Sequence, residues 1–418
     1  MIKHEIKGTF QYMLFERFLT RVVNAGQLSV TGPGTKTAQY GTPDPKLVPV
    51  AIGIADASTA RAIARNPALG AGEAWMDGRM TVAGDDILGL LNLIAYNLRW
   101  DWDNKSRVSL WRNTRWITRM LPRNDGTRAK SNVAHHYDLS DRLYDLFLDA
   151  DRQYSCAYFT DPSNSLETAQ KDKLAHIAAK LCLKTGQHVL DIGCGWGGLA
   201  LYLNRVAGVR VTGVTLSQEQ LRVARQRAED AGVTDMVKFE LIDYRKVTGT
   251  FDRVVSVGMF EHVGRARYND FFNTVRDRLT PEGIALIHTI ARVDGPGATD
   301  PFTARYIFPG GYSPAISEIL PPIEQAWLWP TDIEVLRLHY GLTIEQWYRR
   351  VVAKRTEIEA LYDARFYRMW TFYLSAAIIA FRHDGHCNVQ IQLSRKRDAV
   401  PITRDYMFER EREYRALG

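Results

Sequence analysis

The 418-residue sequence contains no apolar run near the roughly 18 residues that a membrane-spanning helix needs. Its first residues, Met1–Lys7, lack the apolar core of a signal peptide, so we expect neither export nor membrane insertion. Cysteine is scarce, and the four residues Cys156, Cys182, Cys194 and Cys387 form neither a CxxC metal motif nor a dense disulfide pattern. The sequence therefore predicts a reduced, cytoplasmic setting.

Metal ligands and repeats are also lacking. His135 and His136 are adjacent but have no third ligand at a suitable spacing, so we predict no metal site. No internal repeat or low-complexity segment is present. The proportions of 45% hydrophobic and 24% charged residues are ordinary for a globular chain long enough for two or three domains.

The net charge of +7 is unevenly distributed. Between Arg99 and Lys130, nine basic residues face three acidic ones, and Trp100, Trp102, Trp111 and Trp116 lie among or beside them. Indole rings next to long cationic side chains suit the boundary between water and an anionic lipid surface. A solvated basic linker between two domains, or a nucleic-acid partner, would fit the charge as well.

The first part of the chain reads as a small α+β domain. Residues 9–24 predict a helix, with Phe15, Leu19, Val22 and Val23 on one face. Gln27–Ala55 alternates β-forming residues with Gly and Pro turns, as in a small antiparallel sheet. Asp85 and Asp86 cap a further helix that carries Ile87, Leu90, Leu91 and Ile94 at helical spacing. We assign this domain to residues 1–125 and a second domain to residues 126–418.

The second domain predicts α/β architecture, because helices alternate with short apolar strands. The expected strands are His188–Ile192, Val209–Val214, Val237–Ile242, Arg253–Val257 and Ile284–Thr289. The expected helices are Glu167–Leu181, Gly198–Val206, Gln218–Ala231 and Arg267–Leu279.

The strongest local motif is Asp191-Ile192-Gly193-Cys194-Gly195-Trp196-Gly197, a strand that runs into a glycine-rich turn and then a helix. Glycine permits positive φ and lets the backbone approach a ligand closely. A GxGxG pattern alone also fits a dinucleotide site or a ligand-free turn. Because an acid lies inside the strand, the segment resembles motif I of the Rossmann-like methyltransferases, which contacts the amino-acid part of S-adenosylmethionine.

The second strand lacks the terminal acid that takes ribose hydroxyls in many nucleotide-binding folds, since it ends Val214-Thr215-Leu216-Ser217. This makes a nicotinamide cofactor less attractive. Gln220, one turn into the next helix, could supply the missing polar contact. Asp243 and Tyr244, after the third strand, could meet the adenine edge or be ordinary residues of a strand end.

Several separate segments then resemble the cyclopropane-fatty-acyl-phospholipid synthase and mycolic-acid cyclopropane synthase family of methyltransferases. The resemblance covers about residues 130–385. It rests on segments in the family's order: 132–139 (NVAHHYDL), 154–159 (YSCAYF), 213–217 (GVTLS), 258–264 (GMFEHVG), 288–290 (HTI), 306–311 (YIFPGG) and 339–340 (HY). The first 125 residues resemble the extra domain of the bacterial phospholipid enzymes, so this branch is preferred.

The resemblance implies a Rossmann-like methyltransferase fold and an S-adenosylmethionine site. Together with the glycine motif, the candidate cofactor residues are Tyr154, Ser155, Asp191, Gly193, Gly195, Gly197, Thr215, Leu216, Gln220, Asp243 and Tyr244. The family's second strand also ends in Thr, so Thr215 is a feature of this branch rather than a defect.

The resemblance also implies the reaction: methyl transfer to the cis double bond of an unsaturated phospholipid acyl chain, followed by loss of a proton and closure of a cyclopropane ring. In the family the base is a bound bicarbonate. Its candidate site residues here are Cys156, Glu261, His288, Ile290 and Tyr340. Taken alone, Cys156 would more often be a small buried side chain than a catalytic group. His262 is expected to be structural, since adjacent residues of a turn point apart.

Two points leave alternatives open. Ala291 follows His288-Thr289-Ile290 where many relatives have Gly, and relatives on the same scaffold stop at a methyl-branched or methylated unsaturated chain. A nucleic-acid methyltransferase and a non-catalytic lipid-binding protein are further alternatives, although no RNA-binding module is recognisable. We expect a cytoplasmic protein held peripherally at the inner face of the phospholipid membrane, with no nucleic-acid partner. A homodimer is left open.

Overall fold

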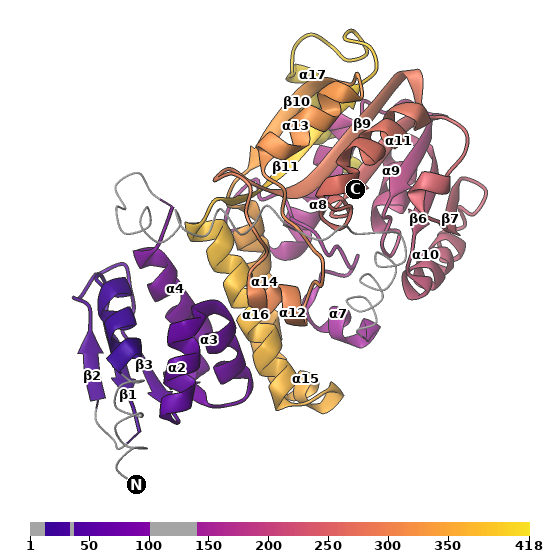
Figure 1. Cartoon of the computed structure of the whole chain (residues 1–418). Coiled ribbons are helices and arrows are strands. Elements are labelled where there is room, and N and C mark those ends of the chain that lie inside the picture. Colours follow the sequence, from indigo (N-terminus) through magenta and orange to yellow (C-terminus); the bar gives the residue numbers. More distant parts are fainter. Residues whose placement is uncertain (1–12, 34–36, 101–139) are drawn as a thin grey trace. The chain divides into compact units, whose positions relative to one another are not determined.

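The computed structural model describes residues 13–33, 37–100 and 140–418, which form two compact units (Figure 1). The first unit takes residues 1–119, 299–309 and 344–385, and the second takes 120–298, 310–343 and 386–418. The chain therefore enters the first unit three times. The predicted boundary between residues 125 and 126 lies outside the described residues and stays a prediction.

A small mixed sheet organises the first unit, in the order β2-β1-β3-β4. Its strands are β1 (Leu28–Thr31), β2 (Thr37–Tyr40), β3 (Val50–Ile54) and β4 (Met80–Val82). The pairing of β1 with β2 is antiparallel as expected, but an antiparallel sheet throughout was wrong, because β1 and β3 run parallel. The link 41–49 with its three prolines carries the chain past β1, so that β3 starts beside the beginning of β1.

Helices complete the first unit. The predicted first helix is present over residues 13–22, with Phe15, Leu19 and Val22 buried. The others are the short 3₁₀ turn η1 (Ala83–Asp85), α2 (Ala57–Arg65), α3 (Pro67–Met76), α4 (Ile87–Asn97), α12 (Pro301–Tyr306), the part of α14 (His339–Ala353) from Ile344 onward, α15 (Arg355–Leu361) and α16 (Ala364–His383). The predicted cap of α4 is confirmed, since Asp86 accepts the Gly89 N–H at 2.8 Å.

The second unit is built on a seven-stranded sheet in the order β10-β11-β9-β8-β5-β6-β7. Its strands are β5 (His188–Ile192), β6 (Arg210–Thr215), β7 (Val237–Leu241), β8 (Phe251–Val257), β9 (Leu279–Arg292), β10 (Trp329–Leu336) and β11 (His386–Ser394). The run from β9 through β8, β5 and β6 to β7 is parallel, and β11 is antiparallel to both β9 and β10. The predicted α/β class and the five predicted strands are confirmed.

Helices flank this sheet because both of its faces are apolar. The α-helices are α7 (Asp141–Phe147), α8 (Leu166–Lys180), α9 (Gly198–Ala207), α10 (Gln218–Asp230), α11 (Tyr268–Arg278), α13 (Ile316–Gln325) and α17 (Asp405–Leu417), and the short 3₁₀ turns are η3 (Tyr244–Lys246), η4 (Phe260–His262) and η5 (Arg265–Arg267). One buried cluster joins α8, α9 and α10 to the strands, and another joins α11 and α13 to them. The four predicted helices correspond to α8, α9, α10 and α11.

The C-terminal stretch is densely charged in both signs, yet it is not a solvated end. It forms α17, in which Met407, Glu411 and Tyr414 are buried and the helix packs against α8. These three residues are spaced four and three apart, so they fall on one helical face despite the high charge around them. Within the described part of the chain, no helix is both long and apolar enough to span a bilayer.

The order of the strands determines where a ligand can enter the second unit. From β5 the chain proceeds to β6 and β7 on one side, and then returns to β8 and β9 on the other. Such a reversal opens a crevice at the carboxyl ends of the strands, because the connections on its two sides lead away in opposite directions. The glycine-rich turn follows β5 at this point.

Candidate functional site

The turn after β5 has the backbone that its glycines predict. Gly193, Gly195 and Gly197 have φ values of +82°, +54° and +84°. A Cβ at Gly193 would lie 2.9 Å from Met259, and one at Gly197 would lie 2.7 Å from Phe239. At Gly195 nothing lies within 4 Å of that position. Gly195 therefore opens on free space, whereas its two neighbours are glycines because the protein itself packs there.

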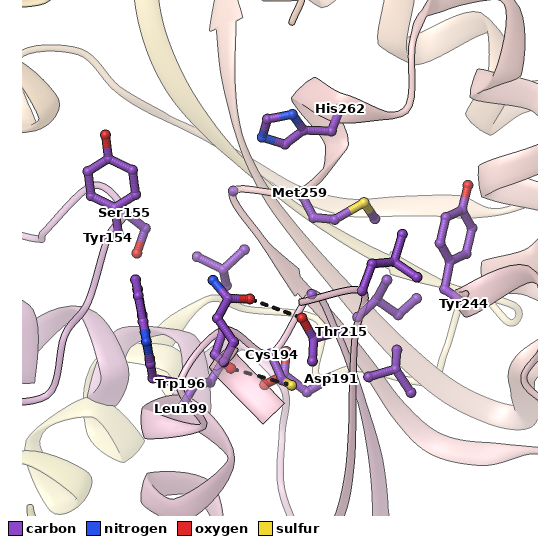
Figure 2. Close-up of a pocket in the computed structure, with 18 of the residues that line it drawn as sticks. Tyr154, Ser155, Asp191, Cys194, Trp196, Leu199, Thr215, Tyr244, Met259 and His262 are labelled. Carbon is purple, nitrogen blue, oxygen red and sulfur yellow. Dashed lines mark hydrogen bonds between the residues drawn. The ribbon is translucent and has the colours of Figure 1, made fainter. Parts of the chain in front are cut away.

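The pocket that opens beside this turn contains nearly all the predicted cofactor residues (Figure 2). Those that line it are Tyr154, Ser155, Asp191, Gly193, Gly195, Thr215, Leu216, Gln220, Asp243 and Tyr244. Gly197 is not among the lining residues, since it faces Phe239. Figure 2 shows Tyr154 and Trp196 on one side of the pocket and Tyr244 on the other.

Polar groups on the floor of the pocket are arranged by the ends of β6 and β7. Thr215 donates its hydroxyl to Gln220 Oε1 at 2.9 Å, which brings the two predicted residues together. Asp243 is paired with Arg245, and the hydrogen bond from that guanidinium lowers the pKa of the Asp243 carboxyl. A carboxylate thus remains ionised on the β7 side of the pocket, while the β6 side presents a hydroxyl and an amide.

Asp191, inside β5, is buried, and desolvation raises its pKa to about 7, although the positive charge of Lys173 opposes the shift. Lys173 is a pocket residue that sequence reasoning missed. Its ammonium donates to Gln153 Oε1 at 2.6 Å and to Ser155 Oγ at 2.9 Å. Burial lowers the pKa of this lysine to about 8. Lys173 therefore holds the segment that carries Tyr154 and Ser155 against the pocket.

Trp196, Met259 and His262 also line the pocket without having been predicted. The argument that Glu261 and His262 point apart agrees with their contacts, since His262 lines the pocket whereas Glu261 accepts the Ile290 N–H. Burial lowers the pKa of His262 to about 4, which keeps the imidazole neutral near pH 7. The η4 turn is too short to show a periodic pattern of hydrophobic residues, so the sequence could not predict that the His262 side chain faces the pocket.

None of the five predicted base-site residues is among the lining residues of this pocket, although Cys156 and Glu261 are the sequence neighbours of the lining residues Ser155 and His262. Glu261 Oε1 accepts the Ile290 N–H at 2.6 Å, so two of the five are joined directly. Glu261 Oε2 is buried and has no hydrogen-bond partner in the described chain. Desolvation raises the pKa of this carboxyl. The free oxygen is a ready contact for a small ligand that carries a hydrogen-bond donor.

His288, on β9, is enclosed by side chains of β11. Its Nε2 lies 3.2 Å from Asn388 Nδ2, and its Nδ1 lies 3.1 Å from Gln390 Nε2. Burial lowers the pKa of His288 to about 3, so the ring is neutral, with one nitrogen donating and the other accepting. One amide must therefore present its oxygen to the ring, which agrees with the partnerless Asn388 Oδ1 and Gln390 Oε1.

Cys156 and Tyr340 come from two segments that are tied together. The Ala157 N–H donates to Thr343 Oγ1 at 3.0 Å, and the Phe159 N–H donates to His339 Nδ1 at 2.9 Å. Both acceptors lie in the first turn of α14, beside the half-buried Tyr340. Burial raises the pKa of the Cys156 thiol far above the physiological range, so this group is a thiol rather than a nucleophilic thiolate.

Metal-binding geometry is not found in the part of the chain that the structure describes. No group of three or more His, Cys, Asp or Glu side chains there could hold a metal ion. His135 and His136, which the sequence analysis considered, lie outside the described residues.

The family model for mycolic acid cyclopropane synthetase matches residues 124–391. The chain is 41% identical over 289 residues to a probable fatty acid methyltransferase of Pseudomonas putida, covering 66% of this chain and 73% of that protein. It is 40% identical over 321 residues to the cyclopropane-fatty-acyl-phospholipid synthase of Escherichia coli (strain K12), covering 75% of this chain and 80% of that protein.

Among solved structures, mycolic acid cyclopropane synthase CmaA1, complexed with SAH and CTAB, aligns with a TM-score of 0.60. It is 31% identical, and the alignment covers 63% of this chain and 97% of that one. The Rossmann-like methyltransferase fold expected for the second domain is thereby confirmed.

We expect Gly195→Val to reduce the affinity for S-adenosylmethionine by on the order of 10-fold or more, because its side chain would occupy the free space beside the turn. Gly232→Val is the matched control. Gly232 has a similar φ of +66° and equally open surroundings, but it is not among the pocket residues. Calorimetry on both folded variants makes the comparison, and parental affinity in Gly195→Val would refute the cofactor assignment.

Proposed function

Because the chain belongs to the mycolic acid cyclopropane synthetase family, we propose that it transfers a methyl group from S-adenosylmethionine to an unsaturated phospholipid acyl chain and closes a cyclopropane ring. The observation that carries the proposal is the glycine turn at Gly193–Gly197 opening on a pocket lined by the predicted cofactor residues. The likeness to the phospholipid synthase of Escherichia coli favours a phospholipid substrate.

S-adenosylmethionine supplies an electrophilic methyl group. A cis double bond is a weak nucleophile, so the protein must align the two partners closely and keep water from the cation that forms. Tyr144 helps to enclose the site, because its ring packs edge-on against Trp196 at 5.0 Å and against Tyr154 at 5.5 Å. The aromatic faces add electrostatic attraction for positive charge without offering a nucleophile.

Ring closure requires a base that takes a proton from the newly added methyl group. Bicarbonate bound by Glu261, His288 and Tyr340, with backbone groups at Cys156 and Ile290, would supply that base. One feature fits such an ion: Glu261 Oε2 is buried without a hydrogen-bond partner and could accept its O–H. Both ring nitrogens of His288 contact Asn388 and Gln390, so binding the ion through His288 would require one of these amides to give up its hydrogen bond. Since the Ile290 N–H already donates to Glu261 Oε1, the role of Ile290 is to orient that carboxylate.

Product analysis tests the proposed activity. The protein is expressed in a host that lacks such lipids, and its phospholipids are examined by mass spectrometry together with double-bond chemistry. We expect a gain of one CH₂ with loss of the double bond, which identifies a ring. A saturated methyl branch or a retained alkene would instead establish the alternative, which the similarity to the fatty acid methyltransferase of Pseudomonas putida also supports. Labelled methyl groups in RNA but not in lipid would establish the nucleic-acid alternative.

We expect Glu261→Gln to lower turnover by on the order of 100-fold while leaving the affinity for S-adenosylmethionine unchanged, because an amide cannot supply the charge-assisted contact of a carboxylate. Turnover is measured at saturating phospholipid, with and without added bicarbonate, and partial rescue by bicarbonate is expected.

Glu318→Gln is the control for neutralising a buried carboxylate that accepts a backbone N–H, here that of Ala315 at 2.9 Å. It should slow turnover far less. A parental rate and product from Glu261→Gln would remove Glu261 from the base site.

Peripheral attachment to the membrane is the proposed way of reaching the acyl chain. It rests on the basic, Trp-rich sequence around Arg112, Arg115 and Arg119, which lies outside the described residues. Replacing these three residues by Glu should weaken binding to anionic vesicles, and salt should weaken binding of the parent similarly. Sedimentation with anionic and neutral vesicles measures the effect. Equal binding of the parent to both kinds of vesicle would show that the segment is only a linker.

A further inference from the structure

Three aromatic side chains form a parallel stack beside the candidate base site. The ring of Tyr158 lies between two imidazoles, with its centroid 4.1 Å from that of His176 and 5.0 Å from that of His339. The interplanar angles are 8° and 3°. The three residues come from the segment after Cys156, from α8 and from the start of α14, so the stack joins three separate parts of the chain.

Carboxylates hold both nitrogens of His176. Its Nδ1 lies 3.0 Å from Glu411 Oε2 on α17, and its Nε2 lies 2.7 Å from Glu334 Oε2 on β10. An ionised carboxylate only accepts hydrogen bonds, so both ring nitrogens must carry a proton for both contacts to form. The geometry therefore requires an imidazolium, and an imidazolium stacked on a tyrosine ring gains a cation–π contribution.

Charged or titratable groups face His176 from every element packed around it. They are Asp172, Lys173 and Lys180 on α8, Asp332 and Glu334 on β10, Arg404, Glu411 and Arg415 on or next to α17, His288 on β9, Arg337 after β10, and His339 on α14. Desolvation would lower the pKa of His176, but the hydrogen bonds that its ring donates to Glu334 and Glu411 outweigh it, and the net shift is upward. Stability from the protonated ring is thus complete below the ordinary pKa of 6.5 and is lost as the pH rises through the higher folded value.

The other end of the stack reaches the candidate base site. His339 accepts the Phe159 N–H through Nδ1, and the next residue along α14 is Tyr340. Tyr158 follows Cys156 by two residues, and its own N–H donates to Ala169 O of α8 at 3.0 Å. A shift of the Tyr158 ring would therefore move both the Cys156 segment and the first turn of α14.

We propose that His176 is a positioning residue, held as an imidazolium between Glu334 and Glu411, which sets Tyr340 and the Cys156 segment through the stacked rings of Tyr158 and His339. The proposal rests on the proposed function, because it assigns those two groups to the base site. It also gives α17 a role in turnover, since Glu411 is one of the two carboxylates that hold the His176 ring. Loss of the imidazolium proton leaves two carboxylates facing a ring with a single N–H, and the stack then loses its fixed position.

The test compares pH profiles of turnover at saturating S-adenosylmethionine for the parent, Glu411→Gln, His176→Gln and Glu413→Gln. Glu413 is the matched control, because it lies on the same helix in an exposed pair with Arg410. We expect turnover of the parent to fall on the alkaline side. Glu411→Gln should move that fall to lower pH by about one to two units, because the imidazolium loses a hydrogen bond to a charged acceptor.

The KM for S-adenosylmethionine should stay unchanged in all variants, and Glu413→Gln should keep the parental profile. His176→Gln should be slow, with the alkaline fall absent. Superimposable pH profiles for Glu411→Gln and Glu413→Gln would overturn the proposal. This comparison tests the proposal even if His176→Gln does not fold.

Nuclear magnetic resonance of ¹³C-labelled histidine, read without substrate, separates this proposal from the proposed function. The His176 resonance is the one missing from His176→Gln or, if that variant does not fold, from His176→Phe. Its titration should move to lower pH in Glu411→Gln but not in Glu413→Gln, and the His339 resonance should respond at the same pH. If the His176 titration does not move in Glu411→Gln, the proposed role of His176 is wrong. If the parent makes no lipid product, only the proposed function is wrong.

Discussion

Burial of positive charge along one face of α8 is the constraint on which the second unit depends. Lys173, His176 and Lys180 are spaced three and four apart, and their exposures are 0%, 4% and 1%. A buried charge is tolerated only where hydrogen bonds and opposite charges replace water. The elements around α8 must therefore supply acceptors: the 153–155 segment for Lys173, β10 and α17 for His176, and β10 for Lys180.

This constraint connects the cofactor pocket to the candidate base site. Lys173 fixes Ser155, which lines the pocket, and His176 stacks on Tyr158, a few residues further along the same segment. Cys156 lies between these two anchors. Removing an acceptor from either anchor would leave an unpaired charge in the interior, so the position of the segment is strongly determined.

Sequence patterns predicted the parts of the fold that depend on local periodicity and turn chemistry. The strand β5 and the glycine turn follow from an apolar run and from residues that tolerate positive φ, and these features need no knowledge of distant partners. Lys173 and Glu411 could not be found in this way, because their burial depends on partners far away in the sequence. In a list of residues, each looks like a solvated charge on an amphipathic helix. The orientation of His262 was missed for a similar reason, since a single 3₁₀ turn has no repeating pattern.

Burial controls the protonation of several titratable groups in the second unit. Around the pocket and the base site, burial keeps His262 and His288 neutral, with pKa values of about 4 and 3, and raises the pKa of Glu261. On α8, carboxylates of β10 and α17 balance the buried His176 and Lys180. A positive imidazole next to the substrate would repel the cation formed on methyl transfer and would be unable to accept a proton. Neutral imidazoles avoid both effects, so the low pKa values of these two histidines suit the chemistry proposed for the site.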